Sequence, residues 1–261
     1  MVNLTIGAGS FKGFAFLGAL EYLDKKKYLT CLENFYGCSI GAIIGFLYII
    51  GYKPINILNK LIDINFSKLW NIDLKNINSK LELIDIDIIF NLLIHVFLKN
   101  DEDKLSLKEF NDKYLVKFNV YAVNLNTRKL ETINEENYSD INIIEILKAS
   151  AAIPLIFRPI KIKNNLFIDG SSKIENFCID NSGYILLIDH SYNNIENYSD
   201  YIHEVLNTLT FNTEFKHRIN TLLINLDIDI RKEINFGIDN NIKFKLYLEG
   251  LKQAKKHYCN I

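Results

Sequence analysis

A single serine lies between two glycines near the start of the chain, in the stretch Gly37-Cys-Ser39-Ile-Gly41. Apolar segments at 34–36 and 42–50 flank it. A nucleophile at the end of a strand needs a sharp turn into a helix, and glycines two positions before and after it relieve the crowding. The amino end of the helix also favours the negative charge of a nearby oxyanion. The spacing therefore indicates a nucleophile elbow at Ser39, although a serine that merely caps a buried helix would give the same short pattern.

A second glycine-rich turn, Gly-Ala-Gly-Ser-Phe-Lys-Gly at 7–13, follows an apolar segment at 2–6. Small residues let backbone N–H groups approach a ligand, as an oxyanion hole requires. A phosphate-binding P-loop would need Gly-Lys-Ser/Thr, but Lys12 precedes Gly13 here. A dinucleotide-binding turn would need glycine at position 12 and an acidic residue at the end of the second strand. The positive charge of Lys12 would lie in the first turn of a helix, where the helix dipole disfavours it. We therefore expect the Lys12 side chain either to be solvated, to hold the loop in place, or to bind an anion.

Two residues are candidates for the general base that Ser39 would need. His190, at the end of the apolar segment 184–189, is the only histidine suited to a Ser-His-Asp triad, but the elbow of such hydrolases normally follows several strands. Asp169 ends the apolar run in NNLFIDGSS and could accept the serine proton directly. With an ordinary pKa of about 3.9, an aspartate is a weak base, so oxyanion donors must supply much of the rate. An Asp-Gly turn without chemistry is the alternative.

The elements that would position these residues begin in the order strand–helix–strand–helix, with a glycine-rich turn where each strand enters its helix. This order predicts parallel strands with helices on the faces of the sheet. The segment 56–116 contains no clear strand, so we expect a helical cap there within a single domain spanning 1–261. The predicted strands are 2–6, 34–36, 117–124, 129–133, 184–189 and 221–226, with a hairpin in 158–170 turning at Asn164-Asn165. The predicted helices are 14–28, 42–50, one starting at Pro54, one or two in 81–98, 141–151, 200–219 and 243–258.

The composition narrows the possible partners and setting. The chain of 261 residues is 49% hydrophobic with a formal net charge of −1, which gives no basic patch for nucleic acid. Four separated cysteines and a start without secretory-signal features predict free thiols in the cytoplasm. The apolar segment 42–50 has about half of the roughly 20 residues that cross a bilayer, so we expect a buried helix rather than a span. Peripheral contact with a membrane surface is compatible with these features.

Three motifs, in this order, resemble those of the patatin-like phospholipase family: AGSFKG at 8–13, GCSIG at 37–41 and DGS at 169–171. Three flanking segments, 51–54, 149–160 and 248–256, extend the resemblance over nearly the whole chain. It implies a three-layer α/β sandwich and hydrolysis of phospholipid acyl esters by a Ser-Asp dyad, without metal or cofactor. The site residues that it implies are the dyad Ser39 and Asp169, the oxyanion loop Gly9, Ser10, Phe11, Lys12 and Gly13, the elbow glycines Gly37 and Gly41, and the Asp-Gly motif residues Gly170 and Ser171.

The sequence departs from the family pattern at several positions. Ala8-Gly-Ser10 replaces a glycine triplet, so the backbone donors survive only if Ala and Ser tolerate the required angles. Ser171 replaces a glycine or alanine, and Asn-x-Pro appears as Asn176-Phe-Cys, shifted by about one residue and without the proline. Two alternatives therefore accompany the hydrolase hypothesis: a catalytically inactive lipid-binding or scaffold protein, and an esterase that uses His190. Residues of the apolar cap are expected either to face lipid or to form core, among them Phe90, Leu92 and Phe97.

Overall fold

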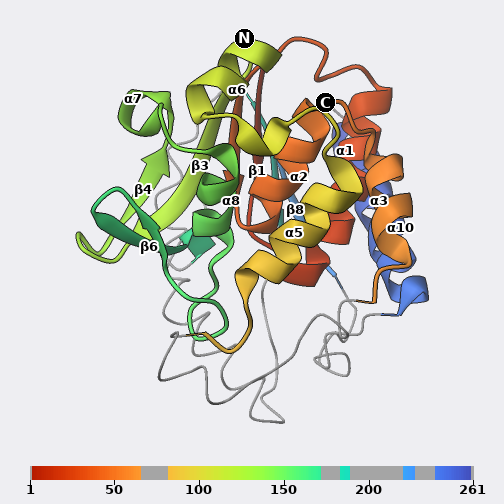
Figure 1. The fold of residues 1–261 in the computed structure, drawn as a ribbon. Coiled ribbons are helices and arrows are strands. Elements are labelled where there is room, and N and C mark those ends of the chain that lie inside the picture. Colours follow the sequence, from red (N-terminus) through yellow and green to blue (C-terminus); the bar gives the residue numbers. More distant parts are fainter. Residues whose placement is uncertain (1, 66–81, 172–182, 189–219, 227–238, 260–261) are drawn as a thin grey trace.

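The computed structural model describes residues 2–65, 82–171, 183–188, 220–226 and 239–259 (Figure 1). Within them, eight strands form one sheet in the order β5-β6-β3-β2-β1-β7-β8, and β4 also pairs with β3. The strands are β1 (Val2–Ile6), β2 (Leu32–Cys38), β3 (Lys117–Asn124), β4 (Lys129–Ile133), β5 (Ile160–Ile162), β6 (Asn165–Asp169), β7 (Gly183–Ile188) and β8 (Thr221–Ile224). The helices are α1 (Gly13–Lys25), α2 (Ile40–Ile49), α3 (Pro54–Ile62), α5 (Ile86–Phe97), α6 (Leu107–Tyr114), α7 (Glu135–Tyr138), α8 (Ile143–Ala151) and α10 (Asn240–Tyr258), with short 3-10 helices η1 (Ser10–Lys12) and η3 (Glu102–Lys104).

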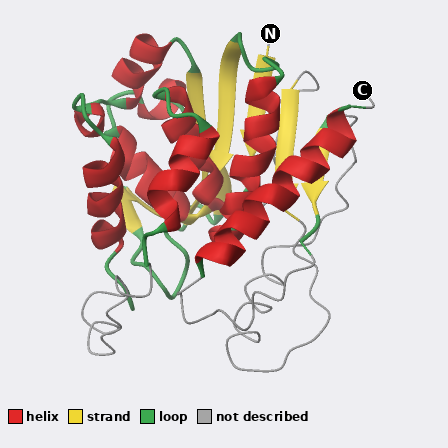
Figure 2. Cartoon of the chain, turned by 90° about the vertical axis from the view of Figure 1, so that its right-hand side faces the viewer, coloured by secondary structure: helices red, strands yellow, loops and turns green. Residues whose placement is uncertain are grey.

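The five strands β3, β2, β1, β7 and β8 pair in parallel. Strands β4 and β6 pair antiparallel with β3, and β5 pairs antiparallel with β6. The expected mixed α/β fold with a mostly parallel sheet is confirmed. Helices cover the face of the sheet that looks toward the viewer in Figure 2. The helix that the sequence predicts at 200–219 lies outside the described residues.

The strands predicted at 2–6, 117–124 and 129–133 have the observed bounds, and the other predicted elements that the structure describes differ by a few residues. The short helix α7 was not predicted. One turn is wrong: the β5–β6 hairpin turns at Lys163-Asn164, because Asn165 already belongs to β6. Lys163 has φ of 53°, a left-handed angle that favours asparagine over lysine. The sequence preference for an Asn-Asn turn was therefore overridden by the register in which Ile162 pairs with Asn165.

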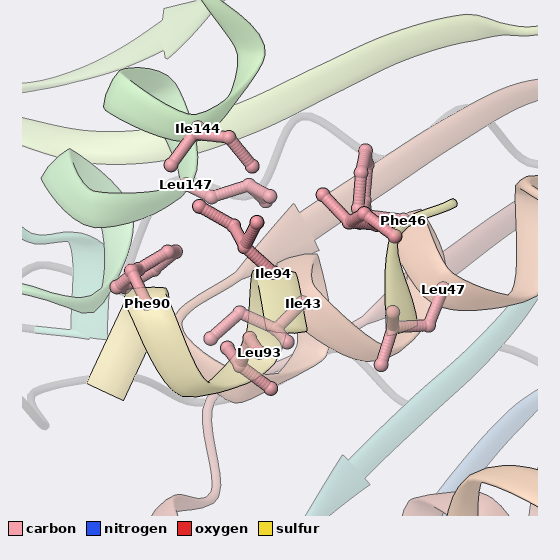
Figure 3. Close-up of a pocket in the computed structure, with 9 residues that line it drawn as sticks. Ile43, Phe46, Leu47, Phe90, Leu93, Ile94, Ile144 and Leu147 are labelled. Carbon is pink, nitrogen blue, oxygen red and sulfur yellow. The ribbon is translucent and has the colours of Figure 1, made fainter. Parts of the chain in front are cut away.

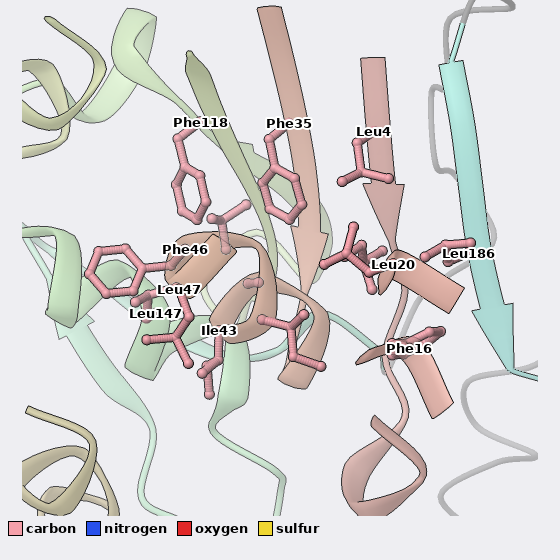
Figure 4. Packing of buried hydrophobic residues seen from close by; sticks show 14 of the residues in the cluster. Leu4, Phe16, Leu20, Phe35, Ile43, Phe46, Leu47, Phe118, Leu147 and Leu186 are labelled. Atoms are coloured by element: carbon pink, nitrogen blue, oxygen red, sulfur yellow. The ribbon is translucent and has the colours of Figure 1, made fainter. Parts of the chain in front are cut away.

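The core forms where alternate side chains of the strands meet the helices. Leu4, Phe35, Phe118 and Leu186 face α1 and α2 from neighbouring strands (Figure 4). The Phe35 and Phe118 rings stack with their centroids 5.1 Å apart. Residues of the segment 56–116 belong to this same core, namely the helical Ile57, Leu58, Ile86, Phe90, Phe97, Leu107 and Phe110, together with Ile84 just before α5.

Among the described helices, none is both long and apolar enough to cross a bilayer alone; α2 and α3 would reach that length and composition only as a pair bent by 120°.

Two strands that are distant in sequence share one edge of β3. Residues 120 and 121 of β3 pair with β2 and with β4, so β2 and β4 lie on opposite edges. Residues 122 and 123 pair with β6 and with β4, so β6 and β4 also lie on opposite edges. Since a strand has only two edges, β2 and β6 pair with the same edge of β3, one after the other along its length. The last residue of each, Cys38 and Asp169, stands opposite adjacent residues of β3, Tyr121 and Ala122 respectively.

Helix α10 packs on α1 through a contact that only glycine allows. A Cβ at Gly18 would lie 1.9 Å from the Tyr247 carbonyl oxygen, and one at Gly250 would lie 1.9 Å from the Ala15 carbonyl oxygen. The two glycines thus let the helix backbones touch, which ties the C-terminal helix to the first crossover.

We expect Gly18→Ala and Gly250→Ala each to lower the free energy of unfolding by about 1–3 kcal/mol, because the added methyl group forces the helices apart. This loss should appear although alanine is the better helix former by about 1 kcal/mol. Urea unfolding measures it. Leu248→Ala, at an exposed position of the same helix, is the control and should change stability by less than about 0.5 kcal/mol. Glycine variants as stable as the wild type would contradict the contact.

Candidate active site

Ser39 occupies the turn between β2 and α2, where the sequence predicts an elbow. Its backbone angles are φ 55° and ψ −128°, a strained conformation for a residue with a side chain. The glycines around it make room: a Cβ at Gly37 would lie 2.5 Å from Ala42 Cα, and one at Gly41 would lie 2.3 Å from the carbonyl oxygens of Ile6 and Gly7. The turn therefore depends on both glycines, and it presses the start of α2 against the end of β1.

The Ser39 side chain meets Asp169, which is 130 positions away in the chain. The hydroxyl donates a hydrogen bond of 2.6 Å from Oγ to Asp169 Oδ2. The backbone N–H of Ser171 donates to the other carboxylate oxygen, Oδ1, at 2.8 Å. Ser39 is 6% exposed and Asp169 1% exposed, so the pair is almost entirely withdrawn from water. The structure thus brings together the two residues that the sequence analysis chose as nucleophile and base.

The backbone around Asp169 is as constrained as that of the elbow. Its N–H donates to the carbonyl of Ala152 at 2.9 Å. A Cβ at the next residue, Gly170, would lie 2.5 Å from the Tyr121 carbonyl oxygen and 2.9 Å from Cys38 Sγ. Glycine at this position therefore allows β6 to end directly against the end of β2. Ser171, the next residue after Gly170, donates its backbone N–H to the Asp169 carboxylate.

Burial raises the pKa of the Asp169 carboxyl above its ordinary value, and this outweighs the hydrogen bonds from Ser39 and Ser171, which lower it. A raised pKa makes the carboxylate a stronger proton acceptor than an exposed aspartate. The Cys38 thiol lies 4.0 Å from Asp169 Oδ1, and burial followed by the nearby carboxylate raises its pKa as well. The thiol therefore stays protonated and does not compete as a second anion.

The glycine-rich loop between β1 and α1 lies against the elbow. Gly13 contacts it directly, since a Cβ there would lie 2.6 Å from Ile40 Cγ1, on the residue after the nucleophile. Gly9 has φ near −170°, an extended angle, whereas Ser10 has φ 46° and takes the left-handed conformation that glycine would adopt more easily. Ser10–Lys12 then form η1, in which Lys12 is buried. The serine that replaces a glycine at position 10 is accommodated with strain.

Ser150, near the end of α8, is a site residue that the sequence analysis did not single out. Its hydroxyl accepts a hydrogen bond of 2.9 Å from the Ser39 N–H and donates one of 2.6 Å to the Tyr121 carbonyl. The only signal was its place inside the family-like segment 149–160, because nothing in its spacing from Ser39 indicates contact. His190, the alternative base, lies outside the described residues.

An apolar recess lies between α2, α5 and α8, behind the helix that starts at the elbow (Figure 3). Phe90 lines it, whereas Phe97 is buried against the Tyr52 ring, with centroids 5.2 Å apart. Leu92 is half-buried and does not line the recess. Of the three cap residues, only Phe90 thus lines this recess, whose volume is about 10 Å³. The lining residues are Ile43, Phe46, Leu47, Phe90, Leu93, Ile94, Leu98, Ile144 and Leu147.

The fold is a mixed α/β fold with a mostly parallel sheet, and its glycine-flanked serine occupies a strand-to-helix turn. The family model described as patatin-like phospholipase matches residues 4–183. The chain therefore belongs to the patatin-like phospholipase family.

Individual relatives agree with this assignment. "Probable lipid hydrolase 463L" of Invertebrate iridescent virus 6 is 33% identical over 175 residues, covering 64% of this chain and 59% of that protein. The structure is similar to VipD from Legionella pneumophila, with a TM-score of 0.57 and 14% identity over 99% of this chain and 66% of VipD. It is also similar to the type III effector ExoU of Pseudomonas aeruginosa, with a TM-score of 0.54 and 12% identity over 99% of this chain and 52% of ExoU. The chain thus spans about half to two thirds of these proteins, and the structures share its fold.

The raised pKa of Asp169 gives a pH dependence of stability with a definite sign. A carboxyl whose pKa is higher in the folded than in the unfolded protein stabilises the fold fully below its unfolded pKa of about 3.9, and this contribution is lost as pH rises through the folded-state pKa. Asp169→Asn carries no such ionisation. Between about pH 4 and pH 8, urea unfolding should therefore show the variant gaining stability relative to the wild type.

Asp140→Asn is the matched control. Asp140 is exposed, and the Lys163 ammonium 3.0 Å away lowers its pKa, so any stability that it contributes is present above the unfolded pKa and lost in acid. The difference between this variant and the wild type should be small and run in the opposite direction. A difference for Asp169→Asn that does not change with pH would mean that the carboxyl is not destabilised by burial.

Proposed function

We propose that the protein hydrolyses the acyl ester bonds of phospholipids, with Ser39 as nucleophile and Asp169 as general base. The observation that carries the proposal is the 2.6 Å hydrogen bond between the two side chains in a nearly water-free site. A serine hydroxyl is a weak nucleophile unless an adjacent base accepts its proton, and this geometry supplies the base without a histidine. Membership in a lipid hydrolase family supports the choice of substrate class.

The reaction follows from this geometry in two steps. Asp169 takes the proton as Ser39 Oγ attacks the ester carbonyl, and the tetrahedral intermediate then expels the alcohol, which receives the proton from Asp169. The resulting acyl-serine is attacked by a water molecule that passes a proton to Asp169. Release of the fatty acid returns the proton to Ser39 Oγ.

The oxyanion of each tetrahedral intermediate needs donors other than the amide of the nucleophile. The Ser39 N–H is already bonded to the Ser150 hydroxyl. The proposed donors are the backbone N–H groups of Gly9, Ser10 and Phe11 in the loop that packs on the elbow. Because donors held in a water-excluded site need no reorganisation during the reaction, they would compensate for the modest basicity of a carboxylate.

The proposed substrate surface is a lipid interface in the cytoplasm. The apolar recess between α2, α5 and α8 begins one helical turn beyond Ser39, at Ile43; its lining is apolar, but its volume of about 10 Å³ is too small for an acyl chain, so the proposal does not place the chain there. Water exclusion around the dyad favours an ester delivered from an apolar phase over a charged, hydrated substrate. Peripheral membrane contact is the partner interaction that this proposal requires.

Two other functions use the same fold. An inactive lipid-binding protein would have no need for the aligned and buried Ser39–Asp169 pair, which costs stability through the desolvated carboxylate. An esterase using His190 would require that imidazole at Ser39 Oγ, where Asp169 Oδ2 already accepts the hydroxyl proton. The dyad therefore favours hydrolysis by the two residues alone.

We expect Ser39→Ala and Asp169→Asn each to lower fatty-acid release from mixed phospholipid vesicles by about 10³-fold or more, because each removes one half of the activated nucleophile. A serine-directed fluorophosphonate should label the wild type and not Ser39→Ala. His190→Ala is the control and should retain release. An unlabelled wild type would support the non-catalytic alternative, and equal release by Asp169→Asn would remove Asp169 from the mechanism.

The pH dependence of kcat/KM on a soluble ester separates the two bases. Activity should rise with pH through the pKa of Asp169, which burial places above that of an ordinary aspartate, because only the carboxylate accepts the serine proton. His190→Ala should leave this limb in place. A limb near pH 6.5, the ordinary pKa of histidine, that disappears in His190→Ala would instead identify the histidine as the base.

A further inference from the structure

The end of α8 contacts both members of the dyad. Ser150 binds the Ser39 N–H through its hydroxyl, and two residues later the Ala152 carbonyl accepts the N–H of Asp169 at 2.9 Å. Ser150 is 0% exposed, so this contact is not shared with solvent. One short segment, 150–152, therefore holds the backbone of the nucleophile and that of the base.

The Ser150 hydroxyl fills a gap in the sheet. Cys38 stands opposite Tyr121 in the parallel ladder of β2 and β3, so the next donor of β2 would be the Ser39 N–H and its acceptor the Tyr121 carbonyl. The chain leaves the sheet at Ser39 with φ 55°, and this ladder bond is not made. Ser150 Oγ bridges the two groups instead, accepting from Ser39 N–H at 2.9 Å and donating to Tyr121 O at 2.6 Å.

Resting on the proposed function, we propose that Ser150 is a positioning residue for hydrolysis: its hydroxyl fixes the strained elbow so that Ser39 Oγ stays within hydrogen-bonding distance of Asp169 Oδ2. Without the hydroxyl, the buried Ser39 N–H loses the 2.9 Å hydrogen bond that ties the strained residue to its neighbours. The same bond keeps the Ser39 amide away from the substrate. Oxyanion stabilisation is then left to other donors, as the proposed function requires.

The test compares Ser150→Ala, which removes the bridge, with Ser150→Thr, which keeps a hydroxyl. We expect Ser150→Ala to lower kcat for ester hydrolysis by about 10- to 100-fold with KM within about twofold of the wild type, since misplacement of a reacting group by an ångström can cost that much. Labelling by a fluorophosphonate should slow to a similar degree. Ser150→Thr should recover most of both rates.

Ser106→Ala controls for general loosening of the fold. Ser106 caps α6, where its hydroxyl accepts from the Glu109 N–H, and the substitution should lower the melting temperature without changing kcat. A fall in kcat for Ser106→Ala equal to that for Ser150→Ala would overturn the positioning role, as would unchanged rates in Ser150→Ala.

A crystal structure of Ser150→Ala decides the inference independently of activity. We expect the Ser39 Oγ to Asp169 Oδ2 separation to exceed hydrogen-bonding distance, whereas an unchanged 2.6 Å contact would overturn the role. If the wild type neither releases fatty acid nor reacts with the fluorophosphonate, the proposed function fails, while this distance still decides what Ser150 does. If Ser150→Ala does not fold, the same two readouts on Ser150→Cys, which keeps the volume but offers a weak acceptor, replace it.

Discussion

The site depends on one edge of β3, with which two strands, β2 and β6, form backbone hydrogen bonds over successive residues. β2 runs along its first part and ends at Cys38, and β6 approaches from the other direction and ends at Asp169, opposite the next residue of β3. Backbone hydrogen bonds set this register, so Ser39 and Asp169, the proposed nucleophile and base, face each other across a junction that does not rely on flexible side chains. Gly170 and Gly37 permit the approach, because any side chain there would collide with the neighbouring backbone.

This junction places costly features together. Ser39 has a left-handed φ, and Asp169 is buried so deeply that its pKa is raised. Each lowers the stability of the fold by holding a group in an unfavourable state that the proposed chemistry uses: a strained backbone angle at the residue whose hydroxyl bonds to Asp169, and a carboxylate poorly solvated enough to accept the serine proton. The extended apolar core between the sheet and helices such as α1 and α2 offsets these losses, and the ties from α8 hold the strained backbone in place.

The sequence pattern predicted the bounds of a strand or the start of a helix well where a single local feature of the sequence indicated them. The strand bounds of β3 and β4 and the helix starting at Pro54 followed from apolar alternation and a single proline. The β5–β6 turn was misplaced because turn preference competes with strand register, and the observed register, which turns at Lys163, pairs Ile160 with Phe167, both of them buried. The elbow was indicated by glycines whose spacing around Ser39 has a steric purpose, whereas the Asp-Gly motif was assigned through the resemblance to the patatin-like family, because an Asp-Gly pair by itself is a common turn.

The sequence by itself determined the chemical identities: a serine in a glycine-flanked turn, an aspartate at the end of an apolar strand, and a small-residue loop ahead of both. Only the tertiary structure decided that Ser39 and Asp169 touch, since their 2.6 Å contact arises from two strands sharing one edge of β3 across 130 positions of chain. It also decided the part of Ser150, whose hydroxyl replaces a ladder bond between residues 29 and 111 positions away. Such a contact leaves no periodic trace in the sequence, because hydrogen bonding across a sheet junction depends on register rather than on neighbouring residues.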